Sequence, residues 1–109
     1  MTAEELRRTK QFALRIIRLV AAVPKTIEGR AIANQLVRCG MSVAANYRAA
    51  CRARSRNEFV AKMGVVFEGA DETQLWFELI IESKLLPVKQ VEPLLWEATE
   101  LSQSLSQSL

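Results

Sequence analysis

Residues 34–80 read NQLVRCGMSVAANYRAACRARSRNEFVAKMGVVFEGADETQLWFELI, and this stretch decides the fold. Apolar side chains recur in it every three or four residues, which is the period of a helix with one buried face. The pattern breaks once, at Arg54-Ser55, where Ser55 and Glu58 have the spacing of a capping box that starts a helix. We therefore predict two long helices, over residues 27–53 and 56–85, joined by a tight hairpin.

Each of these two helices has one continuous apolar stripe, which we predict to face the core. In the first helix, which begins after the capping residue Thr26, the stripe consists of Ile32, Leu36, Cys39, Val43, Tyr47 and Ala50. In the second helix it consists of Phe59, Met63, Val66, Ala70, Thr73, Phe77 and Ile80. The opposite face of the first helix mixes arginines with Met41 and Ala45, which is unusual for a surface that meets only water.

Two further helices flank the pair. We predict the first over residues 3–23, because the residue before Pro24 avoids the helical region. The last begins at Val88, with Pro93 in its first turns, where a missing amide costs least. Their predicted core positions are Leu6, Ala13, Ile16, Val20 and Val23, widened by Phe12, Leu19 and Ile17, and then Leu94, Ala98, Leu101 and Leu105.

Short connections between these helices predict an all-α, antiparallel, up-down-up-down four-helix bundle. The chain has 109 residues, half of them hydrophobic, so we expect a single domain over residues 1–109. The serine-rich end is a weak helix former, and we expect it to fray after about Gln103.

The composition excludes several kinds of chemistry. The chain has no histidine, which removes Ser-His and Cys-His catalysis and His-ligated zinc. Cys39 and Cys51 lie twelve residues apart on one predicted helix, roughly 18 Å along its axis, which is too far for a disulfide within the chain. Glu68 and Glu72 lie one turn apart, but without nitrogen ligands an ion-paired or solvated acidic face is expected there. We predict no metal, no cofactor and no enzymatic activity.

The sequence also bears on location. Phe12 to Val23 is the longest candidate apolar run, and Arg15 and Arg18 interrupt it, so we expect no membrane span. Glu4 and Glu5 occupy the region where a signal peptide carries basic residues, and we expect a cytoplasmic protein.

Charge is divided along the chain. Residues 1–56 contain twelve basic and three acidic side chains, a net +9, whereas residues 57–109 contain three basic and nine acidic ones, a net −6. Such asymmetry favours either contact with nucleic acid or pairing of the two halves, within a chain or between subunits.

Four motifs occur in order: Gln35-Leu36-x-Arg38, Ser42-Val43-x-Ala45-Asn46, Cys51-Arg52-Ala53-Arg54-Ser55-x-x-Glu58-Phe59-x-x-Lys62, and Glu68-x-x-x-Glu72-Thr73-x-x-Trp76. With the flanking helices, they resemble the four-helix-bundle family of 23S rRNA intervening-sequence proteins, which is related to the accessory protein of diversity-generating retroelements. Phe77 and Cys39 depart from that pattern, where leucine and serine are more usual. The resemblance implies a homo-oligomeric ring, a pentamer, and a tie to ribosomal RNA or to a reverse transcriptase and its RNA.

The candidate nucleic-acid-binding residues are Arg38, Arg48, Arg52 and Arg56, because guanidinium groups match phosphates in geometry and charge. The alternative for the same arginines is a solvated surface or an ion-paired subunit interface, satisfied by Glu68, Glu72 and Glu78. Arg54 is expected to cap or pair at the hairpin instead.

Four other residues are candidates for structural or interface roles: Asn46, Glu68, Glu72 and Trp76. Asn46 either bonds across the bundle or lies at a helix edge. Trp76, like Trp96, is expected to anchor the core or an interface. The leading function is a non-enzymatic, homo-oligomeric scaffold that binds RNA or a nucleic-acid-associated protein through an arginine-rich face. The alternative is a protein-interaction module with no nucleic-acid role.

Overall fold

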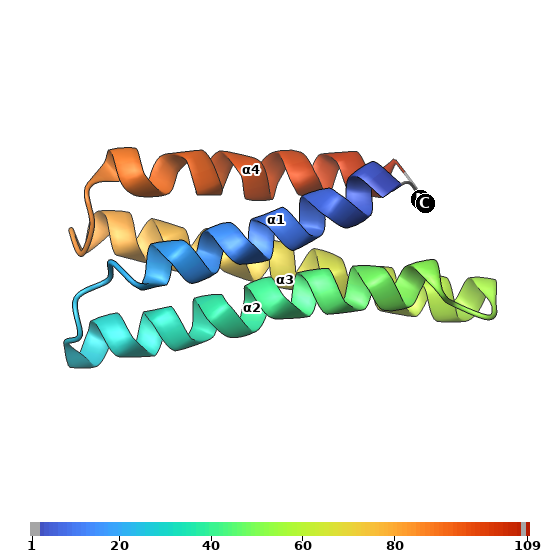
Figure 1. The fold of residues 1–109 in the computed structure, drawn as a ribbon, viewed down its shortest axis with the longest axis horizontal. Helices are drawn as coiled ribbons and strands as arrows, with labels where there is room; N and C mark the ends of the chain where they lie inside the picture. The colour runs from blue at the N-terminus through green and yellow to red at the C-terminus, as the bar shows by residue number, and fades with distance from the viewer. Residues whose placement is uncertain (1–2, 108) are drawn as a thin grey trace.

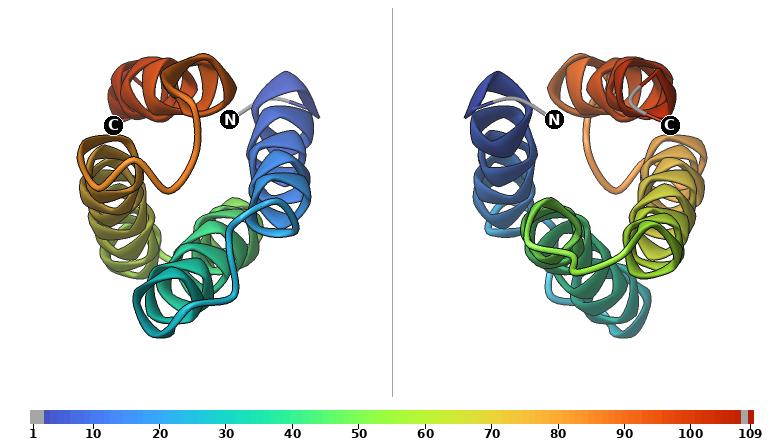
Figure 2. Two further views of the ribbon diagram at one scale, coloured as in Figure 1. Left: turned by 90° about the vertical axis from the view of Figure 1, so that its left-hand side faces the viewer. Right: turned by 90° about the vertical axis from the view of Figure 1, so that its right-hand side faces the viewer.

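The computed structural model describes residues 3–107 and 109, and over these residues the chain forms four α-helices. Their bounds are α1 (Ala3–Val20), α2 (Ile27–Cys51), α3 (Arg56–Glu82) and α4 (Val88–Ser106). Successive helices run in opposite directions, as Figure 1 shows, and the part of the chain described contains no strand. Each helix packs against two others, in the cyclic order α1, α2, α3, α4 (Figure 2). The predicted all-α, antiparallel four-helix bundle is confirmed.

Side-chain caps begin the two central helices where the sequence places them. The hydroxyl of Thr26 accepts a hydrogen bond from the amide of Gly29 at 3.1 Å, and that of Ser55 accepts one from the amide of Glu58 at 3.0 Å. Each cap satisfies a backbone donor that has no partner inside its helix. The carboxylate of Glu58 completes the second cap by accepting the amide of Arg54, rather than that of Ser55.

Three helices end earlier than predicted. α1 ends at Val20 rather than at Val23, α2 at Cys51 rather than at Ala53, and α3 at Glu82 rather than at Leu85. The chain leaves α1 and α2 through tighter turns, in which the amides of residues 22, 23, 52 and 53 bond carbonyls three residues back. α4 instead continues to Ser106, three residues past Gln103, because Leu101 and Leu105 in its last turns are fully buried in the core.

A positive φ of 62° at Lys84 ends the turn after α3. The amide of Lys84 bonds the carbonyl of Ile81, and the amide of Leu85 bonds the carbonyl of Ile80, both at 3.1 Å. This pair of bonds is the Schellman motif, whose left-handed position is usually glycine. The sequence therefore carried no signal for this turn beyond Leu86-Pro87.

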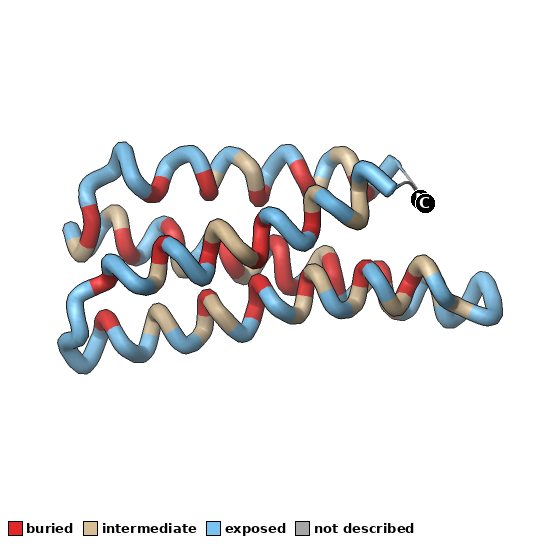
Figure 3. The backbone as a smooth tube through the Cα atoms, in the orientation of Figure 1, coloured by how far each residue is buried: buried red, intermediate tan, exposed pale blue. Residues whose placement is uncertain are grey.

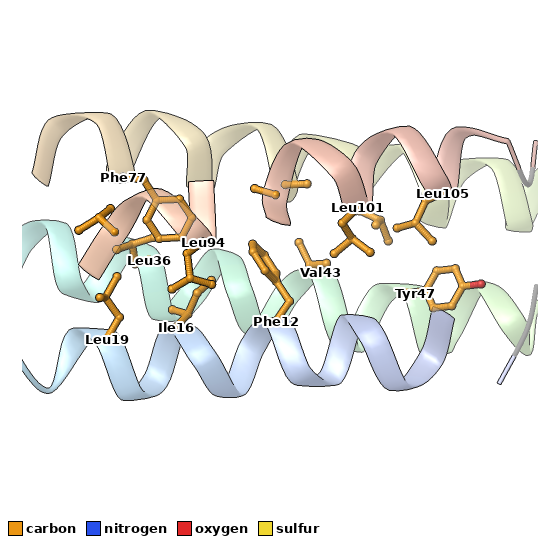
Figure 4. Packing of buried hydrophobic residues seen from close by; sticks show 14 of the residues in the cluster. Phe12, Ile16, Leu19, Leu36, Val43, Tyr47, Phe77, Leu94, Leu101 and Leu105 are labelled. Carbon is orange, nitrogen blue, oxygen red and sulfur yellow. The ribbon is translucent and has the colours of Figure 1, made fainter. Parts of the chain in front are cut away.

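The core runs along the inside of all four helices, as the buried segments in Figure 3 and the side chains in Figure 4 show. Most predicted core positions of the central helices are buried, and Ile32 and Phe59 are half-buried at its margin. All four predicted positions of α4 are buried. On α1, however, Ile17 is 46% exposed, and Thr9 lies in the core instead with its hydroxyl bonded to the carbonyl of Leu6.

The α2–α3 hairpin is longer than the rest of the bundle. α2 and α3 have 25 and 27 residues, whereas α1 and α4 have 18 and 19. At 1.5 Å per residue the difference is roughly 10 Å, and Figure 1 shows the hairpin projecting past the other two helices at one end. None of the described helices combines the length and apolarity that crossing a membrane requires.

Candidate nucleic-acid interface

The projecting end of the α2–α3 hairpin carries a cationic hollow. Arg48 and Arg52 lie one turn apart on the outer side of α2, and both are exposed. Arg54 in the turn and Lys62 on α3 complete the cationic lining. The full lining is Ala45, Arg48, Ala49, Arg52, Arg54, Glu58 and Lys62. We call this surface the arginine hollow.

The arginine hollow has more positive than negative charge. Four cations line it beside a single carboxylate, that of Glu58, which already accepts the amide of Arg54 at 3.2 Å. Within residues 3–107 and 109, the side chains of Arg48 and Arg52 form no ion pair. The small side chains of Ala45 and Ala49 leave room between the guanidinium groups. An anion with several phosphates can therefore meet several donors at once.

Arg38 is not part of the arginine hollow. It lies ten residues before Arg48, about 15 Å away along the axis of α2. Its guanidinium lies 3.5 Å from the carboxylate of Glu72 on α3, and it also donates to the side-chain oxygen of Gln35. The structure therefore separates Arg38 from the predicted set and gives it an acidic partner.

Arg56 also lies outside the arginine hollow, although it is near the hairpin. Its guanidinium donates to the carbonyl of Leu109 at 3.2 Å and stands 6.0 Å from the centre of the Phe59 ring. Arg54, which we expected to pair at the hairpin, lines the hollow in its place, and only its backbone takes part in capping. The structure thus brings together two of the four predicted arginines, Arg48 and Arg52.

Glu72 and Trp76 belong to a polar cluster on the α2–α3 seam. The indole of Trp76 donates to Glu72 at 3.2 Å, while Arg38 approaches the same carboxylate from α2. The pKa of Glu72 is lowered, first by contact with the thiol of Cys39 and then by the indole of Trp76 and the guanidinium of Arg38. Burial foremost, and then Glu72, raise the pKa of Cys39 to about 11. The thiol therefore stays protonated near neutral pH, and a nucleophilic role for it is disfavoured.

The other two structural candidates differ from each other. Asn46 does not bond across the bundle: its amide donates to the carbonyl and hydroxyl of Ser42 in its own helix, at 2.9 and 3.1 Å. Glu68 is exposed on the outer face of α3, and the described part of the chain offers it no ion-pair partner. Trp96, expected as an anchor, is 64% exposed on α4.

Sequence reasoning missed Lys62 and Arg54 as members of the hollow. Lys62 had a usable signal: in a tight hairpin, the first turns of one helix lie beside the last turns of the other. Arg54 had none, because the direction of a side chain in a turn depends on the backbone path. In the described residues, no three Asp, Glu or Cys side chains come together as a metal site.

The family model of the 23S rRNA-intervening sequence protein matches residues 2–107. The chain belongs to this family. A crystal structure of a protein of unknown function from the S23 ribosomal protein family of Bacteroides thetaiotaomicron is similar to it, with 30% sequence identity and a TM-score of 0.86. The match covers 93% of this chain and 94% of that one. No protein of curated function matches this chain. Neither description names a catalytic activity.

Proposed function

We propose that this member of the 23S rRNA-intervening sequence family is a non-enzymatic, homo-oligomeric scaffold, a pentamer, that binds RNA through the arginine hollow. The observation that carries the RNA proposal is the hollow itself, where Arg48, Arg52, Arg54 and Lys62 share one outward surface with one carboxylate. The hollow lies on the last turns of α2 and the first turns of α3. This end of the hairpin projects past α1 and α4 (Figure 1), so a large polyanion can approach it.

Phosphate binding by this hollow has a measurable salt signature. Each phosphate contact releases condensed counterions, so the logarithm of affinity falls with the logarithm of salt concentration, with a slope of about −0.7 per contact on single strands. If all four cations of the hollow engage, the slope is about −3. Binding of a labelled single-stranded RNA, followed by fluorescence anisotropy across a salt series, measures it.

The proposal is tested by comparing alanine substitutions inside the hollow with one outside it. Replacing Arg52 and Arg54 together by alanine should flatten the slope by about 1.4. Arg38→Ala is the matched control: it removes an exposed arginine of the same helix that is already paired with Glu72. A salt-independent affinity, or an equal loss with Arg38→Ala, would contradict the proposal.

Self-association is supported by two large apolar side chains on outward faces, Met41 on α2 and Trp96 on α4, which are 54% and 64% exposed. Sedimentation should give a mass of about five times the 12.3 kDa chain. A species that stays at 12.3 kDa at micromolar concentration would exclude assembly.

The second candidate is a protein-interaction module with no nucleic-acid role. It is favoured by ion pairs that join the basic and acidic halves inside one chain, such as Arg38 with Glu72 and Arg8 with Glu97. An acidic protein, or a nucleic-acid enzyme such as a reverse transcriptase, would then meet the hollow. Undetectable RNA binding at low salt, with assembly intact, decides for this candidate.

A further inference from the structure

Trp96 stands at the centre of the outer face of α4. Its side chain is 64% exposed, whereas Trp76, the other tryptophan of the chain, packs against the core. Glu92 precedes Trp96 by four residues and Glu100 follows it by four, so one carboxylate lies on the same helix face a turn to each side. An exposed indole with an acidic rim is the kind of group that anchors protein interfaces.

A groove of matching chemistry lies between α1 and α2. It has a volume of about 390 Å³, within the range of about 300–1,000 Å³ in which organic groups are held. It is lined by Leu6, Thr9, Lys10, Ala13, Met41, Ala44, Ala45 and Arg48. The alanines leave the space, Met41 supplies an adaptable apolar wall, and the charged members of the lining are both cations.

We propose that Trp96 of one copy of this chain inserts into the α1–α2 groove of a second copy. The inference rests on the self-association proposed above and names the contact that produces it. The indole would lie against Met41, and the ammonium group of Lys10 would stack on its face. The carboxylates of Glu92 and Glu100 would face this cation, and Glu100 also lies 3.6 Å from Arg8 of its own chain. Arg48 stays available to the arginine hollow.

Figure 2 shows α4 on a different side of the bundle from the seam between α1 and α2, whose residues line the groove. One copy can therefore hold a neighbour at each surface. The two sides of such a contact use different residues, so it is a heterologous contact, which generates a closed ring or an open filament according to the rotation between copies. Charge complementarity selects the second copy as the occupant, because the groove is cationic and the rim of Trp96 is acidic.

Fluorescence reports the insertion directly. In Trp76→Phe, Trp96 becomes the single tryptophan of the chain. With rising protein concentration, its emission should shift to the blue and its quenching by acrylamide should fall, in step with the mass from sedimentation. If the mass rises while Trp96 stays as quenchable as in the monomer, the inference is wrong, although self-association stands.

Two variants and their mixture test the pairing without relying on fluorescence. Trp96→Ala removes the inserting group, and Met41→Glu places a carboxylate in the groove; both sites are exposed, so the fold should persist by circular dichroism. Each variant alone should remain at 12.3 kDa. An equimolar mixture should form a dimer and nothing larger, because only one functional contact can form between the two variants.

Each other result overturns the inference in a distinguishable way. Assembly that survives Trp96→Ala means that the subunits meet elsewhere. A mixture that stays monomeric means that Trp96 and the groove are not partners. A wild-type chain that is itself monomeric removes self-association as well, while the salt series on RNA still tests the hollow independently. Val65→Ala, at a 39% exposed site on α3, is the control and should leave assembly unchanged.

Discussion

Tyr47 shows how one buried polar group ties two helices together. It is the only tyrosine in the chain, and its side chain is fully buried at one end of the core (Figure 4). Its hydroxyl donates to the carboxylate of Glu5 on α1 at 2.6 Å. Burial foremost, and then the contact with Glu5, raise the pKa of Tyr47 well above its ordinary value. The neutral phenol is therefore strongly favoured in the folded chain.

This shift predicts alkaline unfolding. Because the folded pKa of Tyr47 is raised, its contribution to stability is complete below the unfolded pKa of about 10 and is lost as pH rises above it. Phenolate absorption at 295 nm should therefore appear together with the loss of helical circular dichroism. Tyr47→Phe is the control and should show no such absorption. Ordinary titration near pH 10 in a chain that keeps its helices would contradict the prediction.

At the scale of one helix, α3 contains two glycines with opposite surroundings. A Cβ at Gly69 would lie 2.9 Å from Cγ2 of Val43 and 3.5 Å from the carbonyl oxygen of Cys39, so α2 and α3 approach closely there. A Cβ at Gly64 would have nothing within 4 Å. The first glycine permits packing, whereas the second only weakens the helix.

These surroundings predict opposite effects of the same substitution. Gly64→Ala should stabilise the fold by about 1 kcal/mol, the difference in helix propensity. Gly69→Ala gains the same propensity but crowds the stiff side chain of Val43, and overpacking costs about 1–3 kcal/mol. We expect Gly69→Ala to be less stable than Gly64→Ala by about 2 kcal/mol in urea denaturation. Equal midpoints would mean that the two helices separate without cost.

In the turn after α3, substitution to glycine, rather than away from it, is expected to stabilise the fold. Lys84 occupies a left-handed conformation with φ 62°, which costs an L-residue about 1–2 kcal/mol that glycine avoids. Glycine also loses more freedom on folding, so Lys84→Gly should stabilise the fold by roughly 0.5–1 kcal/mol net. Lys84→Ala keeps the strain and should gain nothing in the same denaturation experiment. If Lys84→Ala stabilises the fold as much as Lys84→Gly, the left-handed backbone conformation is not the cause of the gain.

What the sequence could predict follows from period and spacing. A helix buries one face, so the stripes that contain Leu36, Val43 and Phe77 identified the core before any contact was known. The hairpin could be located because the spacing of Ser55 and Glu58 is that of a capping box, and the Ser55 side chain does cap α3. The exposure of Ile17 could not be predicted, because it lies at the edge of the apolar arc, where the rotation of α1 against its neighbours decides burial.

The candidate site was harder to predict than the core. Arg38 and Arg48 share one face of α2, yet a face says nothing about which α3 residues stand opposite. The register of α3 against α2 places Glu72 beside Arg38, whereas in the described residues Arg48 forms no ion pair and shares the hollow with Glu58 alone. A helical projection shows the direction of each side chain, whereas a binding surface depends on neighbours from another helix.

At the scale of the whole molecule, the four helices are not held equally. α2 and α3 share the most extensive contact, and α1 and α4 the least extensive one. Among the described residues, the ion pairs across the α1–α4 seam centre on Arg8, whose guanidinium donates to both carboxylate oxygens of Glu97 at 3.0 and 3.1 Å and lies 3.6 Å from Glu100. The Arg8 and Glu97 side chains are only 26% and 17% exposed, so water screens this pair less than a surface pair. Opening of the bundle is therefore expected to begin between α1 and α4.

Arg8→Met tests this order of opening, because methionine keeps an apolar stem while removing the bidentate pair. We expect a loss of about 1 kcal/mol, above the median for exposed pairs, since the carboxylate of Glu97 is left half-buried without its partner. Faster amide hydrogen exchange should be confined to α1 and α4, while α2 and α3 keep their protection. Arg7→Met is the matched control on the same helix: its pair with Glu4 is 61% and 66% exposed, and its removal should change neither quantity. Faster exchange in all four helices would mean that the bundle opens as one unit, and that the ion pairs of Arg8 contribute to global stability rather than closing one seam.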